Sequence, residues 1–213
     1  MNSLVKKYAF PVVWELAFII AYILLPDTIK TLNIFIIFYL GIGIFYYKEF
    51  SFHRYFRNLK SFKGFWIPVI ATFIAGLILH YLKTDVIRAN LPWISTQTYS
   101  ITRRNSLLSE LTYAFTVIFV GPIAEELLFR KAIMSFESKN LTIITFFVGL
   151  LLCAFSHAYL PVGVMEALIL AVPFSIAYYY TRNIYVPITV HILLMMYEQL
   201  PDIAYDLARI SMQ

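Results

Sequence analysis

Seven long apolar runs dominate this chain, and they constrain its fold more than any other feature. They cover residues 8–25, 31–47, 65–82, 107–124, 141–158, 162–180 and 184–199. An α-helix rises about 1.5 Å per residue and the hydrocarbon core of a bilayer is about 30 Å thick, so each run approaches the length of a spanning helix. The sequence therefore predicts an all-α fold, a polytopic transmembrane helix bundle with about seven membrane helices.

The residue usage of the chain agrees with this prediction and excludes an ordinary soluble domain. Hydrophobic residues make up 61% of the 213 residues, charged residues only 14%, and the mean hydropathy is +0.75. The net charge of +5 comes from lysines and arginines in short segments between apolar runs, a pattern of membrane topology and not of a nucleic-acid surface. We therefore expect the lipid bilayer as a partner, no nucleic acid, and a multi-pass location in the cell membrane, namely a bacterial plasma membrane.

The distribution of basic residues predicts the orientation of the chain. The segment after the second run is the most positive connection, and the positive-inside rule assigns it and the N-terminus to the cytoplasm. With seven crossings the C-terminus then lies outside. We expect two parts, residues 1–104 with about three transmembrane helices and their loops, and residues 105–213 with a core of about four transmembrane helices. The basic residues of that connection are Lys48, Arg54, Arg57, Lys60 and Lys63.

Charged residues inside apolar runs are the second informative feature. A charge at the centre of a bilayer costs about 2.5–3.5 kcal/mol on insertion scales, so such a group usually faces a partner or a cavity. Helical spacing places Glu126 and Arg130 on one face as an ion pair, whereas Glu125 is turned about 100° away and is left available as a base. The alternative is that these residues only mark a helix end at the membrane interface. The ionisable residues within these runs or directly after them are Glu15, Glu110, Glu125, Glu126, Arg130, His157, Glu166, His191 and Glu198, with His80 near the end of a run.

Two histidines downstream can meet Glu125 inside the membrane. Glu125 lies fourteen residues before Lys139, and His157 lies eighteen after it. If the helix that carries Glu125 continues to a turn near Ser138, an antiparallel hairpin puts the two residues roughly 21 and 27 Å from that turn, at similar depth. His191 lies roughly 14 Å from its own turn at residues 181–183 by the same rise. A purely structural role for each histidine is the alternative.

A carboxylate with two imidazoles points to hydrolysis by one of two routes. Glu125 can take a proton from water while an imidazole polarises a carbonyl, or Glu125, His157 and His191 can hold a catalytic zinc with an open position. Other intramembrane hydrolases are disfavoured by missing motifs. The chain has no H-E-x-x-H, no G-x-S-x-G and no aspartate deep in a run, and Ser156 is the direct neighbour of His157, which disfavours a Ser–His dyad.

The order and spacing of these residues resemble the CAAX protease and bacteriocin-processing family, also called Abi or CPBP intramembrane proteases. The sequence EELLFR is similar to its E-E-x-x-x-R motif, and two histidines stand where its F-x-x-x-H and H-x-x-x-N motifs have them, over about residues 105–200. The resemblance implies an intramembrane endopeptidase in which Glu125 with His157 activates the attacking water. It further implies that Glu126 with Arg130 supports the site and that His191 helps to hold the oxyanion.

Two positions depart from the family pattern. Met195 stands at the asparagine position of the third motif and Cys153 at the phenylalanine position of the second. A thioether donates no hydrogen bond, so one oxyanion donor is lost unless another group replaces it. The expected substrates are peptides or membrane proteins, in bacteriocin processing or self-immunity, and the alternative is a catalytically weak or inactive membrane scaffold or immunity protein of the same fold. The glutamate-water mechanism requires no cofactor, and divalent zinc is the alternative.

Overall fold

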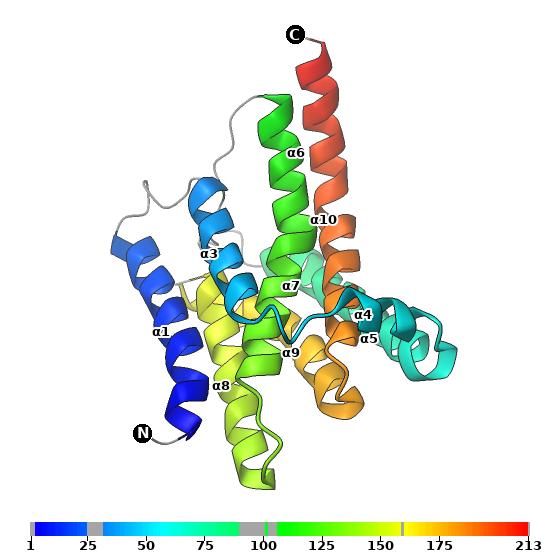
Figure 1. The fold of residues 1–213 in the computed structure, drawn as a ribbon. Coiled ribbons are helices and arrows are strands. Elements are labelled where there is room, and N and C mark those ends of the chain that lie inside the picture. Colours follow the sequence, from blue (N-terminus) through cyan, green and yellow to red (C-terminus); the bar gives the residue numbers. More distant parts are fainter. Residues whose placement is uncertain (1–2, 25–31, 90–100, 102–105, 159, 213) are drawn as a thin grey trace.

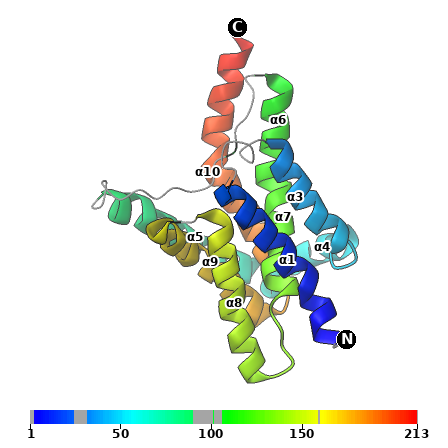
Figure 2. The ribbon, with the colours of Figure 1, turned by 90° about the vertical axis from the view of Figure 1, so that its left-hand side faces the viewer.

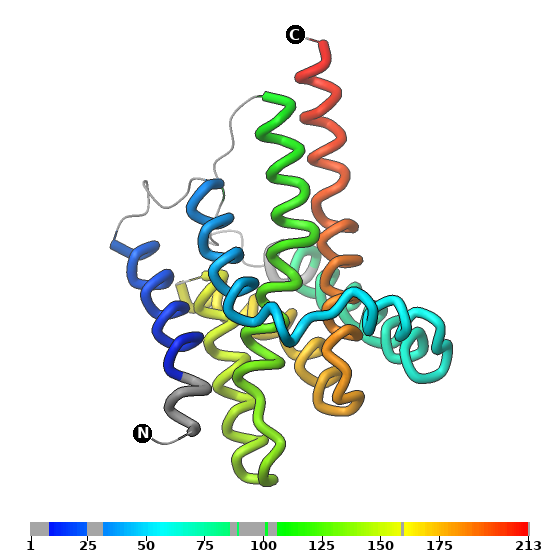
Figure 3. Tube along the Cα trace, in the orientation of Figure 1, coloured from blue at the N-terminus to red at the C-terminus, as the bar shows by residue number. Residues whose placement is uncertain are grey.

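The chain forms a bundle of helices in a computed structural model (Figures 1 and 3). The structure describes residues 3–24, 32–89, 101, 106–158 and 160–212. Within these ranges the regular elements are all helices, which confirms the predicted all-α fold. The predicted boundary between residues 104 and 105 lies outside the described residues.

The N-terminal half contributes four helices. Two of them, α1 and α3, are apolar, α4 is short and polar, and α5 is extended at both ends by π-helical turns. The elements are α1 (Ser3–Leu24), α3 (Leu32–Phe45), α4 (Phe52–Leu59), η1 (Phe62–Trp66), α5 (Ile67–Tyr81) and η2 (Leu82–Arg88).

The C-terminal half begins with one continuous helix in which α-helical and π-helical segments alternate, and three further helices follow. Its first helix consists of α6 (Leu107–Phe115), η3 (Thr116–Val120), α7 (Gly121–Glu125) and η4 (Glu126–Ala132). The others are α8 (Lys139–His157), α9 (Pro161–Thr181) and α10 (Tyr185–Ser211).

Each predicted apolar run corresponds to a helix, and the chain is a multi-pass membrane protein. Among the described residues, four helices are long and apolar enough to cross a membrane, namely Phe62–Asp85, Leu107–Ala132, Lys139–His157 and Pro161–Thr181. The apolar helices Ala9–Leu24 and Leu32–Phe45 are shorter, so seven is an approximate number of crossings. The first residues of α1 and the last of α10 lie at opposite ends of the bundle in Figures 1 and 2, as an odd number of crossings requires. Which end faces the cytoplasm stays a prediction.

Local hydrogen bonds fix where the hairpins of the C-terminal half turn. Ser138 begins α8, where its Oγ accepts from the backbone N–H of Leu141 at 3.2 Å, and Arg182 ends α9 in the left-handed conformation at φ 54°. The expected continuation of the preceding helix to Ser138 is wrong, because η4 ends at Ala132. The N–H of Ser135 donates instead to Thr145 Oγ1 of α8 at 2.9 Å, so the chain leaves the helix and is held against its neighbour.

A glycine brings the two arms of this hairpin close together. A Cβ atom at Gly149 of α8 would lie 2.7 Å from the carbonyl oxygen of Phe129 in η4. Small residues allow such backbone approach between membrane helices. The close contact fixes α8, which ends at His157, against the helix that carries the paired glutamates.

Candidate active site

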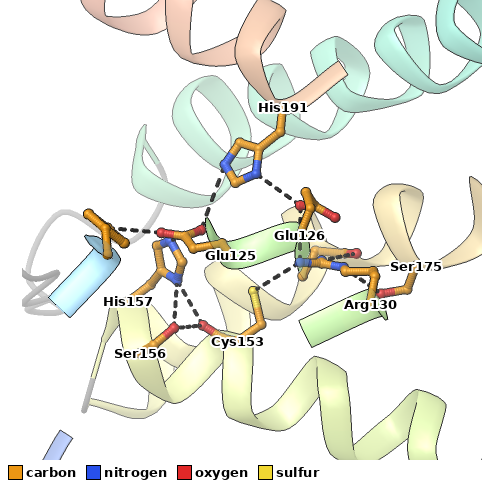
Figure 4. A network of polar contacts seen from close by, with 10 residues as sticks. Glu125, Glu126, Arg130, Cys153, Ser156, His157, Ser175 and His191 are labelled. Carbon is orange, nitrogen blue, oxygen red and sulfur yellow. Dashed lines mark hydrogen bonds and ion pairs between the residues drawn. The ribbon is translucent and has the colours of Figure 1, made fainter. Parts of the chain in front are cut away.

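The five predicted site residues come from four elements, and the structure brings all of them together. Glu125 is the last residue of α7, Glu126 and Arg130 belong to η4, His157 ends α8, and His191 lies in α10. Figure 4 shows their side chains converging from these elements. The family roles of these residues are thus compatible with their positions in space.

Glu125 lies at the centre of the cluster with its two oxygens in different surroundings. Oε1 accepts a hydrogen bond from the hydroxyl group of Tyr39 at 3.0 Å. Oε2 lies 3.4 Å from Nε2 of His157 and 3.9 Å from Nε2 of His191, and it has no hydrogen-bond partner among the described residues. One oxygen is therefore held in place while the other remains able to accept a proton.

The end of α8 orients the ring of His157. Its Nδ1 lies 2.8 Å from the carbonyl oxygen of Cys153, an acceptor, so Nδ1 carries the ring proton and Nε2 faces Glu125. Ser156 Oγ lies 3.2 Å from the same Nδ1, closer than its position in the sequence suggested. The hydroxyl group of Ser156 donates to the Cys153 carbonyl at 2.7 Å, and Nδ1 of His157 donates to the same carbonyl. Because Nδ1 is a donor here, His157 is not placed as a base for Ser156.

Arg130 is buried at 1% exposure and its three nitrogens all have partners. NH1 donates to Glu126 Oε1 at 3.2 Å and to Cys153 Sγ at 3.7 Å, which confirms the predicted pair. The other two nitrogens bind α9, where Nε donates to Ser175 Oγ at 3.3 Å and NH2 to the Ala171 carbonyl at 3.0 Å. A buried ion pair needs such additional hydrogen bonds to offset the cost of its desolvation.

His191 is hydrogen-bonded to the Glu126–Arg130 ion pair. Its Nδ1 lies 2.9 Å from Glu126 Oε1, and its ring stacks on Phe174 with 4.9 Å between the ring centroids. A carboxylate accepts only, so Nδ1 donates to Glu126 and the proton on this nitrogen is fixed. Glu126 therefore orients His191, a role that helical spacing alone did not predict.

The side chains of Glu125, Arg130, His157 and His191 line a cavity of about 160 Å³. Met195 lines it together with His191, so the departure from the family motif lies inside the cavity and not on the lipid face. At another part of the wall His80 Nδ1 lies 2.7 Å from Glu198 Oε1, so Glu198 is paired with α5. The cavity wall includes Glu125, Arg130, His157, Glu166, His191 and Met195.

Two residues near the site come from the N-terminal half and were not predicted as part of it. Tyr39 is one of 16 tyrosines, and nothing in its sequence neighbourhood distinguishes it from the others. Glu15 was recognisable as an acidic residue within an apolar run, and its electrostatic partners are Glu125 and His157. Only the packing of α1 and α3 against the core relates either residue to the site.

Glu125, His157 and His191 are of the residue types that bind zinc, but their side chains are not spaced as zinc ligands are. A carboxylate and two imidazole nitrogens are groups that zinc takes as ligands. Among the described residues, however, His, Cys, Asp and Glu side chains form no group of three with the spacing of a metal site. Glu125, His157 and His191 would have to rearrange to hold the ion.

Comparison with known proteins agrees with the motif analysis. Residues 107–196 match the family described as Type II CAAX prenyl endopeptidase Rce1-like. The matched segment contains every predicted site residue, and it confirms the family resemblance found in the sequence. Comparisons with curated proteins and with solved structures gave no match.

Proposed function

Because residues 107–196 match the CAAX prenyl endopeptidase family, we propose that this chain is an intramembrane endopeptidase. Its substrates are small membrane-associated or leader-bearing peptides, and its role is bacteriocin processing or self-immunity in a bacterial plasma membrane. The observation that carries the proposal is the arrangement of Glu125, with Oε1 bound by Tyr39 and Oε2 facing His157 in a cavity. A held carboxylate with one open oxygen is suited to general-base work.

In the proposed reaction a water molecule in the cavity gives a proton to Glu125 Oε2 while its oxygen attacks the scissile carbonyl carbon. The carbon–nitrogen bond of the tetrahedral intermediate then breaks, and the proton passes from Glu125 to the leaving amine. His157 Nε2 lies 3.4 Å from the same oxygen and stabilises its charge when the ring is protonated. Glu125 ends the cycle ionised, ready for the next water.

The oxyanion of the tetrahedral intermediate needs a hydrogen-bond donor to stabilise its charge. His191 uses Nδ1–H for Glu126, so donation from Nε2 requires that both ring nitrogens carry a proton. Met195 lines the same cavity and offers no hydrogen. We therefore propose a working but slow enzyme, in which His191 acts alone where the family pattern has a histidine and an asparagine.

We further propose that the water mechanism operates without a metal ion. It is supported by the spacing of Glu125, His157 and His191, which is not that of a metal site. If zinc were bound, these three side chains would supply its ligands, and the ion would activate the water in place of the carboxylate. Cleavage that survives a chelator supports the metal-free route, and cleavage that is lost and then restored by one added metal contradicts it.

The test is cleavage of a leader-bearing membrane peptide by protein purified into proteoliposomes. Wild type is compared with Glu125→Gln and His157→Ala, and with Glu137→Gln, which alters an exposed glutamate outside the cavity. We expect cleavage by wild type and Glu137→Gln and its loss in the other two. Cleavage that survives both site substitutions contradicts the proposed roles.

Met195 favours a second candidate, a weak or inactive scaffold or immunity protein of the same fold. In that case the polar cluster holds the bundle together and the protein acts by binding a partner. Protection of cells from a bacteriocin that persists in Glu125→Gln, with no cleavage by wild type, supports this second function. Protection that is lost in Glu125→Gln at unchanged expression supports the endopeptidase.

A further inference from the structure

The short polar helix α4 has no part in the candidate site, and it lies between two apolar helices (Figure 1). α3 ends at Phe45 before it, and the candidate membrane span Phe62–Asp85 begins three residues after α4 ends at Leu59. The whole of α4 precedes the segment that matches the family, residues 107–196. Because a membrane span follows it almost directly, α4 lies close to the surface of the bilayer.

One side of α4 is fixed to the C-terminal half of the protein. Asn183, in the turn between α9 and α10, donates from Nδ2 to Asn58 Oδ1 at 2.7 Å. The hydroxyl group of Tyr55 lies 3.3 Å from Oγ1 of Thr189 in α10, and Tyr55 and Leu59 both pack against the hydrophobic core. These contacts determine which side chains of α4 face away from the bundle.

The side chains that face away form an apolar sector and a basic sector. Phe52 and Phe56 are four residues apart and share one side of the helix, where they are 67% and 59% exposed. Arg54, Arg57 and Lys60 are exposed as well, and at 3.6 residues per turn their directions centre roughly 120° away from the two rings. Exposed aromatic residues beside a basic sector are typical of helices that lie in the plane of a membrane interface.

The basic side chains of α4 and of the following turn are not neutralised within the protein. None of them forms an ion pair with a residue that the structure describes. Glu49 is the acidic residue of the connection between α3 and α5, and its Oε2 lies 3.5 Å from Nζ of Lys131 instead. Phosphate groups of anionic phospholipids supply complementary charge at a bilayer surface. We call these side chains the basic cluster, which consists of Arg54, Arg57, Lys60 and Lys63, all of them exposed.

We propose that α4 is an interfacial helix that binds anionic phospholipids, with Phe52 and Phe56 among the acyl chains and the basic cluster at the phosphate groups. The two rings favour lipid over a soluble acidic partner, because acyl chains remove exposed aromatic surface from water. The contacts of Tyr55 and Asn58 hold the helix in the orientation that this binding requires. The surface is separate from the candidate active site, and the proposal does not depend on peptide hydrolysis.

The first test measures the depth of two spin labels on α4 in proteoliposomes, attached to Phe56→Cys and to Arg54→Cys. The natural cysteine, Cys153, is buried, and wild type treated with the same label measures its background. We expect the label at residue 56 to collide mainly with oxygen, which concentrates in the acyl chains, and the label at residue 54 to collide mainly with a water-soluble nickel chelate. Phe52→Cys repeats the measurement one turn earlier and should agree with Phe56→Cys. Labels on both sectors that are equally accessible to the nickel chelate overturn the proposal.

The second test measures lipid preference with spin-labelled phosphatidylglycerol and spin-labelled phosphatidylcholine, each at trace level in phosphatidylcholine bilayers that contain the protein. We expect wild type to retain the anionic lipid at its surface in preference to the zwitterionic one. Replacement of all four residues of the basic cluster by glutamine should lower this preference by about fivefold or more, because each basic residue near an anionic surface contributes to the attraction.

A matched pair of single variants controls for the loss of charge alone. Arg57→Gln and Arg209→Gln each remove one positive charge, but Arg209 lies near the end of α10 with NH2 3.1 Å from Asp206 Oδ1. We expect Arg57→Gln to lower the lipid preference and Arg209→Gln to leave it unchanged. A preference that is the same in wild type and in the variant without the basic cluster overturns the proposal, since a soluble acidic partner would then be the better match for these charges.

Discussion

Nδ1 of His191 lies 2.9 Å from Oε1 of Glu126, the same oxygen that accepts a hydrogen bond from Arg130 NH1 at 3.2 Å. Glu126 therefore joins three helices of the bundle, since Arg130 is in turn bound to α9 through Ala171 and Ser175. The carboxylate fixes both the proton on Nδ1 and the direction of the ring. The buried ion pair is thus part of the site's geometry as well as of its stability.

The first prediction concerns this shared carboxylate. Glu126→Gln leaves the guanidinium of Arg130 buried without a countercharge, and we expect the free energy of unfolding to fall by about 3–5 kcal/mol. The double variant Glu126→Gln with Arg130→Met removes both charges and should recover much of that loss while cleavage stays low, because His191 is no longer held by a carboxylate. Unfolding in a denaturing detergent and cleavage of a leader peptide measure the two effects. A double variant with restored cleavage would show that Glu126 acts only by neutralising Arg130.

The second prediction separates Glu125 from its neighbour. Glu125→Gln keeps the shape of the side chain and its hydrogen bond with Tyr39 but cannot take a proton, so kcat is expected to fall by about 10²–10⁴-fold. Stability should change little, because no countercharge of Glu125 is as deeply buried as Arg130. Thermal unfolding of the purified variant is the control for intact folding. A variant that unfolds as readily as Glu126→Gln contradicts the division of roles between the two glutamates.

The sequence was sufficient for the parts of the site that depend on helical periodicity. Glu126 and Arg130 form the predicted pair because residues four apart share a helix face, even in the wider turns of η4. The meeting of Glu125 and His157 followed from two arms of similar length around Ser138, although the first arm ends early, at Ala132. Local spacing and capping are encoded in neighbouring residues and can be recognised there.

The sequence was not sufficient for contacts set by packing between distant helices. Tyr39 reaches Glu125 across 86 residues, and His191 reaches Glu126 across 65. Glu15 could be recognised as a carboxyl group inside an apolar run, but its position beside the site depends on how α1 packs against α8. No periodicity within one helix determines which helix it will contact.

The third prediction concerns the hydrogen bond from the N-terminal half to the base. Tyr39→Phe removes the donor to Glu125 Oε1, and the carboxylate then loses the hydrogen bond that holds this oxygen in place. A hydrogen bond to a charged group is worth about 1.5–3 kcal/mol, so we expect kcat to fall by about tenfold or more with KM little changed. Tyr47→Phe, at an exposed tyrosine, is the matched control. Equal kinetics for Tyr39→Phe and wild type would mean that the ring and not the hydroxyl group matters.

The fourth prediction concerns the close approach of α8 to η4. In Gly149→Ala the new Cβ would lie 2.7 Å from the Phe129 carbonyl oxygen, a backbone atom that cannot move alone, so we expect a loss of about 1–3 kcal/mol in the free energy of unfolding. The shift of α8 should also move His157 and lower kcat. Gly43→Ala, where a Cβ meets nothing within 4 Å, is the control and should be neutral or more stable by up to about 1 kcal/mol. Similar stability of the two variants would contradict the tight contact.

The fifth prediction concerns the methionine that replaces the asparagine of the family pattern. Met195 lines the cavity with His191, four residues earlier on the same helix, so Met195→Asn places an amide donor on the wall where the oxyanion forms. One such donor is worth about 2.7–4 kcal/mol in other hydrolases, and we expect kcat to rise by about 10²-fold with KM little changed. Met195→Leu keeps a similar volume without a donor and should cleave at the wild-type rate. If the asparagine variant is no faster than the leucine variant, either another group already binds the oxyanion or the carbonyl of the substrate does not lie against α10. Repeating the comparison with Glu125→Gln in both variants distinguishes these outcomes, because an oxyanion site that works without the general base still gives the asparagine variant the higher residual rate.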